Sequence, residues 1–224
     1  MISVVIPTYN AKQGLMRLLD CLKACPYKYE VVVADGGSSD GTVSYAKSRD
    51  CRIVATAKGR GMQLKAGAAA TSGEWLLVLH ADTVLSPEWP EVLTDFFNRP
   101  DAADKAAYFT FALDDPISQD ARRIEDMVAW RCETLGLPFG DQGLLLTRAL
   151  YDVVGGYEAV PLMEDVGLVR RIGKERLVCL PAKAITSAER YQKDGYFLRP
   201  LRNLFCLGLY YLGVPPQTIL RFYG

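Results

Sequence analysis

The sequence predicts an α/β fold with a mainly parallel central sheet and helices on both faces. Short apolar runs alternate with segments whose apolar residues recur at helical spacing, which is typical of strand–helix–strand units. Polar groups follow directly on several runs, as in WLLVLHADT, residues 75–83, and open α/β sheets bind ligands at such strand ends. No linker, low-complexity segment or internal repeat divides the chain. We therefore expect a single domain over residues 1–224.

Four apolar runs in the first half predict strands, at residues 3–6, 30–34, 52–56 and 75–79. Between the first two strands, four leucines share one helical face: Leu15, Leu18, Leu19 and Leu22. Asp40 can cap a helix that begins near Thr42, and Gly73 closes a helix over 59–71. The run from Trp75 to Leu79 contains no polar residue, so we expect this strand to be buried on both faces.

In the second half, Ser86-Pro87 resembles an N-cap followed by proline at the first helical position. The apolar face of that helix consists of Trp89, Val92, Leu93 and Phe96. Further strands are predicted at 106–113, 144–146 and 176–180, and helices at 117–135 and from Glu164 to about Ile172. From Glu189 the chain becomes basic and aromatic, with a helical pattern over 195–224.

Composition excludes several classes of function. The 26 basic residues balance the 26 acidic ones, whereas nonspecific nucleic-acid binding needs a basic surface. The six cysteines form no CxxC pair and only one histidine is present, so we expect free thiols rather than a zinc site. The start, MISVVIP, lacks the basic region of a signal peptide, and no apolar window reaches the ~20 residues of a membrane span. We expect a cytoplasmic protein.

Acidic residues stand at several predicted strand or helix ends: Asp35, Asp82, Asp141 and the pair Glu164-Asp165. Because parallel strands end on one edge of a sheet, we expect Asp35 and Asp82 to share a crevice. Clustered carboxylates repel one another unless a cation compensates, and Mg²⁺ or Mn²⁺ suits oxygen ligands beside a phosphate-bearing substrate. His80, next to this group, could bind metal or donate a hydrogen bond. No Walker lysine motif, no GxGxxG after the first strand and no GxSxG elbow occurs.

Four segments follow one another in a characteristic order. They are SVVIPTYNA (3–11), EVVVADGGSSDGT (30–42), WLLVLHADT (75–83) and LMEDVGL (162–168). In this order they resemble the nucleotide-binding start, the Asp-x-Asp motif and the Glu-Asp motif of family 2 glycosyltransferases, which have the GT-A fold of nucleotide-diphospho-sugar transferases. The small size, with GRGMQ, HADT and GDQG, is similar to the radical-SAM-associated or arsenosugar-biosynthesis group of these enzymes. The resemblance implies a nucleotide-sugar-binding half at 1–115, an acceptor and catalytic half at 116–190 and a basic-aromatic tail at 191–224.

The resemblance also implies a donor site for a nucleotide sugar. The base and ribose would lie on four residues after the first strand: Pro7, Thr8, Tyr9 and Asn10. Asp35 matches the acid that contacts uracil, which favours a UDP-sugar, although Gly36 replaces the second acid of that motif. Arg60 matches a basic residue near the nucleotide. His80 replaces the first acid of Asp-x-Asp, which leaves its ribose contact open.

For the chemistry, the resemblance implies a metal-dependent, inverting transfer to an acceptor hydroxyl. Asp82 matches the ligand of a divalent metal, Mn²⁺ or Mg²⁺, that bridges to the diphosphate. Asp165 matches the general base, with Glu164 beside it. Asp141 and Gln142 would line the acceptor side, and Arg190 would contact the diphosphate. The Gln-x-x-Arg-Trp motif of processive synthases is absent, which predicts one sugar transferred per encounter.

Two other functions stay open at this stage. A nucleotidyltransferase also uses acids at strand ends, but it needs a glycine-rich, basic loop after the first strand, and TYNAKQG is a poor version. A non-catalytic nucleotide-sugar-binding protein would account for the departures at Gly36 and His80. The tail has three interpretations: a helix packed on its own domain, a contact with the inner face of the membrane, or a homodimer contact. The sugar and the acceptor stay unknown.

Overall fold

The computed structural model describes residues 1–223, and the side chains of Arg190 and Asp194 lie outside the described part. Its centre is one eight-stranded sheet with the order β3-β2-β1-β4-β7-β6-β8-β5. The strands are β1 Ile2–Thr8, β2 Tyr29–Asp35, β3 Arg52–Ala55, β4 Trp75–Val78, β5 Val84–Leu85, β6 Ala106–Leu113, β7 Leu144–Thr147 and β8 Leu177–Thr186. All but β5 and β7 run in one direction. The predicted α/β class with a mainly parallel sheet is confirmed.

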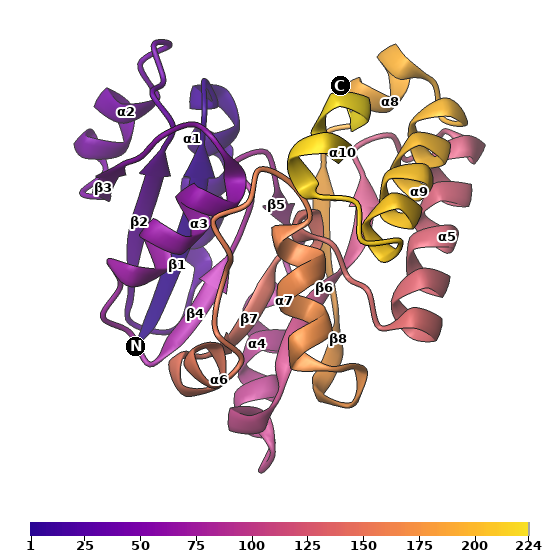
Figure 1. Ribbon diagram of the computed structural model, residues 1–224. Helices are drawn as coiled ribbons and strands as arrows, with labels where there is room; N and C mark the ends of the chain where they lie inside the picture. The colour runs from indigo at the N-terminus through magenta and orange to yellow at the C-terminus, as the bar shows by residue number, and fades with distance from the viewer. Residues whose placement is uncertain (224) are drawn as a thin grey trace.

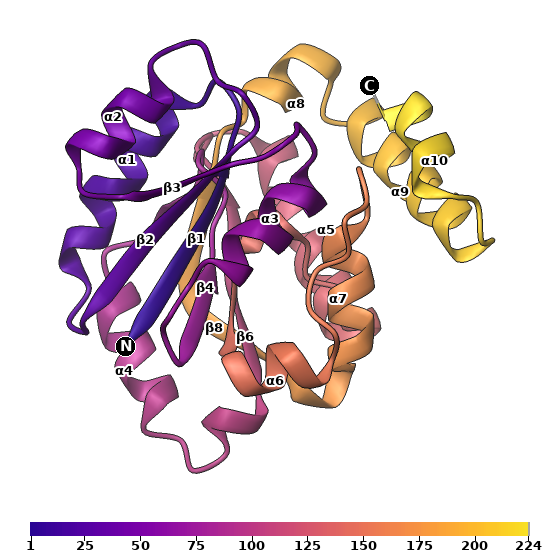
Figure 2. The same ribbon diagram turned by 60° about the vertical axis from the view of Figure 1, so that its left-hand side comes forward.

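Ten α-helices cover this sheet in the described chain. They are α1 Lys12–Cys21, α2 Thr42–Ser48, α3 Arg60–Ala69, α4 Trp89–Phe97, α5 Gln119–Leu135, α6 Arg148–Val153, α7 Glu164–Ile172, α8 Glu189–Asp194, α9 Leu198–Tyr211 and α10 Pro216–Tyr223. Apolar residues of α1 and α4 pack on one face of the sheet, and those of α3, α6 and α7 pack on the other. Helices α5, α9 and α10 lie together at the side farther from β3 (Figures 1 and 2). The prediction of helices on both faces is therefore confirmed.

The run around β4 has no polar residue because both of its faces are buried. Leu76 and Val78 belong to the core under α3, α6 and α7, whereas Leu77 and Leu79 belong to the core under α1 and α4. All four side chains are buried, because successive side chains of a strand point to opposite faces. The expected burial on both faces is confirmed, and it ends at His80, where the chain leaves the sheet.

The N-terminus of α4 lies two residues after the predicted one. Val84–Leu85 form a short edge strand that pairs antiparallel with β8, which the sequence did not indicate. Ser86 continues this contact, since its N–H donates to Lys183 O (2.9 Å) and its Oγ accepts from Lys183 N (2.7 Å). The Ser86 hydroxyl thus bonds to β8 instead of capping the helix. The helix begins at Trp89, with Glu88 as N-cap.

The tail forms two helices rather than one. Helix α9 ends before Gly213, which has φ +81°, and Pro215 precedes α10. The buried residues Cys206, Leu207 and Ile219 pack against α7 and the segment before it. No helix in residues 1–223 is both long and apolar enough to cross a membrane. The six cysteines are free thiols, as expected.

Candidate active site

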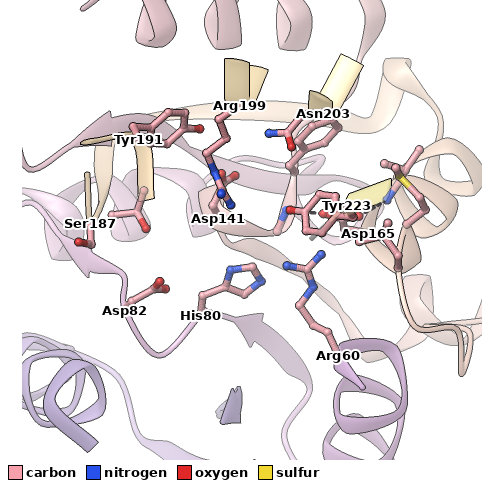
Figure 3. Close-up of a pocket in the computed structure, with 16 residues that line it drawn as sticks. Arg60, His80, Asp82, Asp141, Asp165, Ser187, Tyr191, Arg199, Asn203 and Tyr223 are labelled. Atoms are coloured by element: carbon pink, nitrogen blue, oxygen red, sulfur yellow. Dashed lines mark hydrogen bonds between the residues drawn. The ribbon is translucent and has the colours of Figure 1, made fainter. Parts of the chain in front are cut away.

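A cavity of about 100 Å³ lies beyond the carboxyl end of β4, between the sheet and the C-terminal helices. Asp82, Asp141 and Asp165 all line it, together with His80 and Arg60. Figure 3 shows Asp82, His80 and Arg60 on one side of the cavity and Arg199 on the opposite side. Five of the residues predicted from separate motifs therefore meet in one place. The arrangement places carboxylates, an imidazole and guanidinium groups around one small polar space.

The loop after β4 carries His80 and Asp82. A turn closes it, in which Thr83 N–H donates to His80 O (3.1 Å). Helix α1 packs directly against this loop at Gly14, where an added Cβ would lie 2.5 Å from Ala81 O and 3.1 Å from Asp82 Cα. Only a glycine permits this approach, because a side chain there would overlap backbone atoms. The position of Asp82 therefore depends on a residue outside the cavity.

Arg60 comes from the first turn of α3 and forms an ion pair with Glu164. Glu164 has no exposed side-chain surface, whereas Arg60 is 31% exposed and lines the cavity. Burial raises the pKa of Glu164 to about 7, although the positive charge of Arg60 acts in the opposite direction. Gly61 lets the helix approach the backbone of residues 158–160, since an added Cβ would lie 2.3 Å from Val160 O. Glu164 thus orients Arg60 from the protein interior and does not itself reach the cavity.

Asp165 is held by backbone groups on both carboxylate oxygens. Oδ2 accepts from Gly140 N–H and Oδ1 accepts from Val166 N–H, each at 2.8 Å. Met163, the N-cap of α7 two residues before Asp165, has φ +66°, an unusual conformation for a residue with a side chain and one found disproportionately at functional sites. Gly140 also touches the imidazole, because an added Cβ there would lie 2.7 Å from His80 Nε2. The base candidate and the histidine therefore flank the same glycine.

The donor set at this cavity suits a hard divalent cation. Burial raises the pKa of Asp141, with Arg131 lowering it and the neighbouring charge of Asp165 raising it further. Asp141 Oδ1 is buried with no hydrogen-bond partner among residues 1–223. No group of three or more His, Cys, Asp or Glu side chains in that range could hold a metal unaided. Since Mg²⁺ typically takes only one or two carboxylates from the protein, Asp82 and Asp141 are the residues of this cavity whose chemistry suits such an ion.

Asp35 does not line this cavity, so the prediction that it shares a crevice with Asp82 is not met here. Its carboxylate accepts hydrogen bonds from Thr8 Oγ1 (2.8 Å), Gly37 N–H (2.9 Å), and the N–H and hydroxyl of Ser38. Burial acts to raise its pKa, but these hydrogen bonds outweigh burial and hold the pKa below its ordinary value. Among residues 1–223, Asp35 is not one of the cavity-lining residues. Its carboxylate instead joins the end of β1 to the turn after β2.

The predicted base and ribose residues follow β1 on the same edge of the sheet. Tyr9 is 45% exposed, and the ammonium of Lys58 lies over its ring at 3.8 Å from the centroid. Asn10 has φ +49° and accepts a hydrogen bond from Ser39 N–H (2.8 Å). Pro7 and Thr8 form the last residues of β1. Tyr9 is thus the residue of this group that presents a ring to solvent.

Gln142 does not line the cavity, contrary to its expected place on the acceptor side. Its side chain is 2% exposed and bonds inward, with Nε2 donating to Phe109 O (3.2 Å) and Oε1 accepting from Arg131 (3.0 Å). The short helical turn over Gly140–Gln142 carries Asp141 to the cavity side and Gln142 to the core.

The sequence missed several residues of the site because they come from the tail. These residues are Arg199, Asn203 and Tyr223, which line the cavity together with Tyr191, the neighbour of the predicted Arg190. Arg199 points into the cavity in Figure 3. The basic and aromatic composition of the tail was visible in the sequence, but no spacing indicated which side chains turn inward. Arg190 was expected to contact the diphosphate, but its side chain lies outside the described part of the structure.

Gln63 is a further residue that the sequence did not single out. Its Nε2 donates to Thr8 O (2.7 Å) and to Ala34 O (2.9 Å). A buried amide therefore satisfies the carbonyls at the ends of β1 and β2 and maintains their separation. The GRGMQ segment contains this residue, but only the packing of α3 reveals its role.

Comparison with known proteins agrees with the architecture. The model of glycosyl transferase family 2 matches residues 3–149, which is 147 of the 224 residues. An undecaprenyl-phosphate 4-deoxy-4-formamido-L-arabinose transferase of Yersinia pestis (strain Pestoides F) is 31% identical over 99 residues, covering 39% of this chain and 30% of that protein. The matches reach 12%, 37% and 30% of the first three curated relatives, so the chain spans well under two thirds of each.

Two solved structures share the fold at low sequence identity. S. aureus TarS 1–349 in complex with UDP-GlcNAc has a TM-score of 0.62 and 17% identity, covering 83% of this chain and 58% of that one. The mannosyltransferase PcManGT from Pyrobaculum calidifontis, in complex with GDP-Man and Mn²⁺, has a TM-score of 0.62 and 19% identity, covering 90% and 59%. The GT-A architecture expected from the sequence is therefore present, while the narrower radical-SAM-associated or arsenosugar group stays a prediction.

Proposed function

This chain belongs to glycosyl transferase family 2, and we propose that it transfers a sugar from a nucleotide-diphosphate donor to an acceptor hydroxyl with inversion. The observation that carries the proposal is the meeting of Asp82, Arg60 and Asp165 in one cavity beyond the end of β4. Similar folds hold UDP-GlcNAc in TarS, and GDP-Man with Mn²⁺ in PcManGT. These groups supply what the reaction needs: a metal ligand, a cation for the diphosphate and a carboxylate base.

On the donor side, Asp82 would hold a divalent cation together with the diphosphate. Asp141, which the resemblance assigns to the acceptor side, would be a second carboxylate ligand of that cation, because its Oδ1 is buried and has no hydrogen-bond partner among residues 1–223. A cation there offsets the negative charge that builds on the departing diphosphate, an effect of several kcal/mol in general. Arg60, oriented by Glu164, would contact the diphosphate as a second positive group. Tyr9 offers a ring on which the base could stack, on the edge of the sheet where Asp35 holds the adjoining turn.

A cavity of about 100 Å³ is smaller than the roughly 300–1,000 Å³ of typical small-molecule sites. We therefore propose that it receives the sugar and diphosphate, with the base outside it.

On the acceptor side, Asp165 would accept the proton of the attacking hydroxyl. Its two backbone hydrogen bonds fix the carboxylate in one orientation, which is the positioning that general base catalysis requires. Glu164, which the resemblance placed beside the base, is fully buried and paired with Arg60. We assign it the positioning of Arg60 rather than proton transfer.

The experiment is a calorimetric titration with UDP- and GDP-sugars in the presence of Mn²⁺, Mg²⁺ or EDTA. We expect one nucleotide to bind in a metal-dependent way and Asp82→Asn to lose that dependence. Asp95→Asn, an exposed aspartate on α4 outside the cavity, should bind as wild type. Affinity that is equal with metal and with EDTA contradicts the metal role. Tight binding without turnover over a broad acceptor panel would favour the non-catalytic alternative.

A further inference from the structure

A second, larger cavity lies between α5 and α9, with a volume of about 760 Å³. Met127 and Trp130 of α5 form one wall, and Leu201 and Leu204 of α9 form the other. These side chains are 46–63% exposed. The volume lies within the range of small-molecule sites, roughly 300–1,000 Å³. The chain thus exposes a deep apolar groove rather than a few scattered apolar residues.

The groove lies beside the catalytic cavity. Phe139, Tyr191 and Asn203 line both of them. Arg199, one turn before Asn203 on α9, points into the catalytic cavity (Figure 3). A molecule that fills the groove therefore has one end next to the cavity that Asp165 lines.

We propose that the groove binds the hydrocarbon chain of an amphiphilic acceptor whose polar head reaches the catalytic cavity. The inference rests on the proposed transferase function, because it assigns the acceptor class to the same site. The lining changes along the path from apolar side chains in the groove to Arg199 and Asn203 at the junction. This change matches a ligand with a long apolar part and a polar or anionic head. A second protein copy or a bilayer surface could cover the exposed leucines, but neither accounts for a groove that shares lining residues with the active site.

The test uses the full chain and a series of n-alkyl phosphates below their micellar concentrations, with methyl phosphate as the short probe. Each buried methylene contributes about 0.8 kcal/mol, which is about fourfold in Kd. We expect the affinity to rise at least tenfold from octyl to dodecyl phosphate in isothermal titration calorimetry.

Leu201→Glu places a charge in the groove at a position that is 52% exposed. Leu212→Glu is the matched control, since Leu212 is 82% exposed, follows the end of α9 and lies outside the groove lining. Leu201→Glu should lose at least tenfold in dodecyl phosphate affinity while Leu212→Glu binds as wild type. Melting temperatures within about 3 °C of wild type establish that both variants are folded.

Several results would overturn the inference. One is affinity that does not depend on chain length. Another is equal loss in both variants. A third is that the wild-type protein is a dimer, binds no alkyl phosphate and becomes monomeric in Leu201→Glu. In that case the groove is an interface between two copies of the chain. A fourth is that the protein floats with phosphatidylcholine vesicles but binds no alkyl phosphate. In that case the groove is a contact with the bilayer surface.

UDP and GDP titrations with Mn²⁺ on wild type and Leu212→Glu separate this inference from the proposed function. Nucleotide binding without chain-length dependence overturns the groove alone. Chain-length-dependent binding without nucleotide binding supports the groove as a hydrocarbon site and contradicts the transferase.

Discussion

Gly14→Ala tests whether the packing of α1 sets the position of the metal ligand candidate. Gly14 is buried within α1, and the added methyl carbon would lie 2.5 Å from Ala81 O. An ordinary contact begins at about 3.4 Å, so the carbonyl has to retreat by about 0.9 Å. Because Asp82 is the next residue, its carboxylate moves with the loop. The substitution therefore displaces an active-site group without touching the cavity.

The effects on stability and function differ in size. Overpacking costs typically ~1–3 kcal/mol, and the better helix propensity of alanine returns up to ~1 kcal/mol. The net destabilisation is about 0–2 kcal/mol, or at most about 8 °C in melting temperature for a domain of this size. A displacement near 1 Å in a positioned group can cost about 10²-fold. We expect the metal-dependent affinity for UDP to fall about 10- to 100-fold.

The assay is UDP titration calorimetry with Mn²⁺ and with EDTA, alongside thermal unfolding. Gly208→Ala is the matched control, because Gly208 lies within α9 and an added Cβ would meet nothing within 4 Å. It should gain roughly 0.5–1 kcal/mol from helix propensity alone and bind UDP unchanged. If Gly14→Ala also melts higher than wild type and keeps its UDP affinity, the steric argument is wrong.

Two further substitutions test the other parts of the site. Asp165→Asn should retain metal-dependent donor binding within about threefold while kcat for transfer falls roughly 10²–10⁴-fold; loss of donor binding as well would contradict the assignment as base. Asp35→Asn should lower stability by about 1.5–3 kcal/mol, as expected for hydrogen bonds to a charged group, measured by urea unfolding at pH 7. Because the folded pKa of Asp35 is depressed, this stabilisation is present above the unfolded value near 3.9 and lost as the pH falls through the folded value. The difference between wild type and variant should therefore shrink below about pH 4, and a difference that grows on acidification would refute the hydrogen-bond explanation.

Local sequence patterns were sufficient to predict most of the fold and the residues of the main motifs. The β6 strand and the α7 helix occur at the predicted residues, 106–113 and Glu164–Ile172. Leu15, Leu18, Leu19 and Leu22 are all buried, as their spacing predicted. These features follow from local periodicity, and a buried strand or an amphipathic helix shows its environment in its own residues. Asp35 and Asp82 could likewise be assigned to one edge, because parallel strands all end there, but only Asp82 of the two lines the cavity.

Which side chains of those motifs reach the cavity depends on how the helices pack against the sheet. Glu164 and Asp165 are adjacent, yet one turns into the core toward Arg60 and the other faces the cavity; Asp141 and Gln142 divide in the same way. Gly14 and the tail residues Arg199 and Asn203 belong to the site through contacts between segments far apart in sequence. No periodicity records such contacts, because they arise when α1, α7 and α9 pack around the end of β4. The carboxylates were therefore predictable as a group, and their separate roles depend on packing.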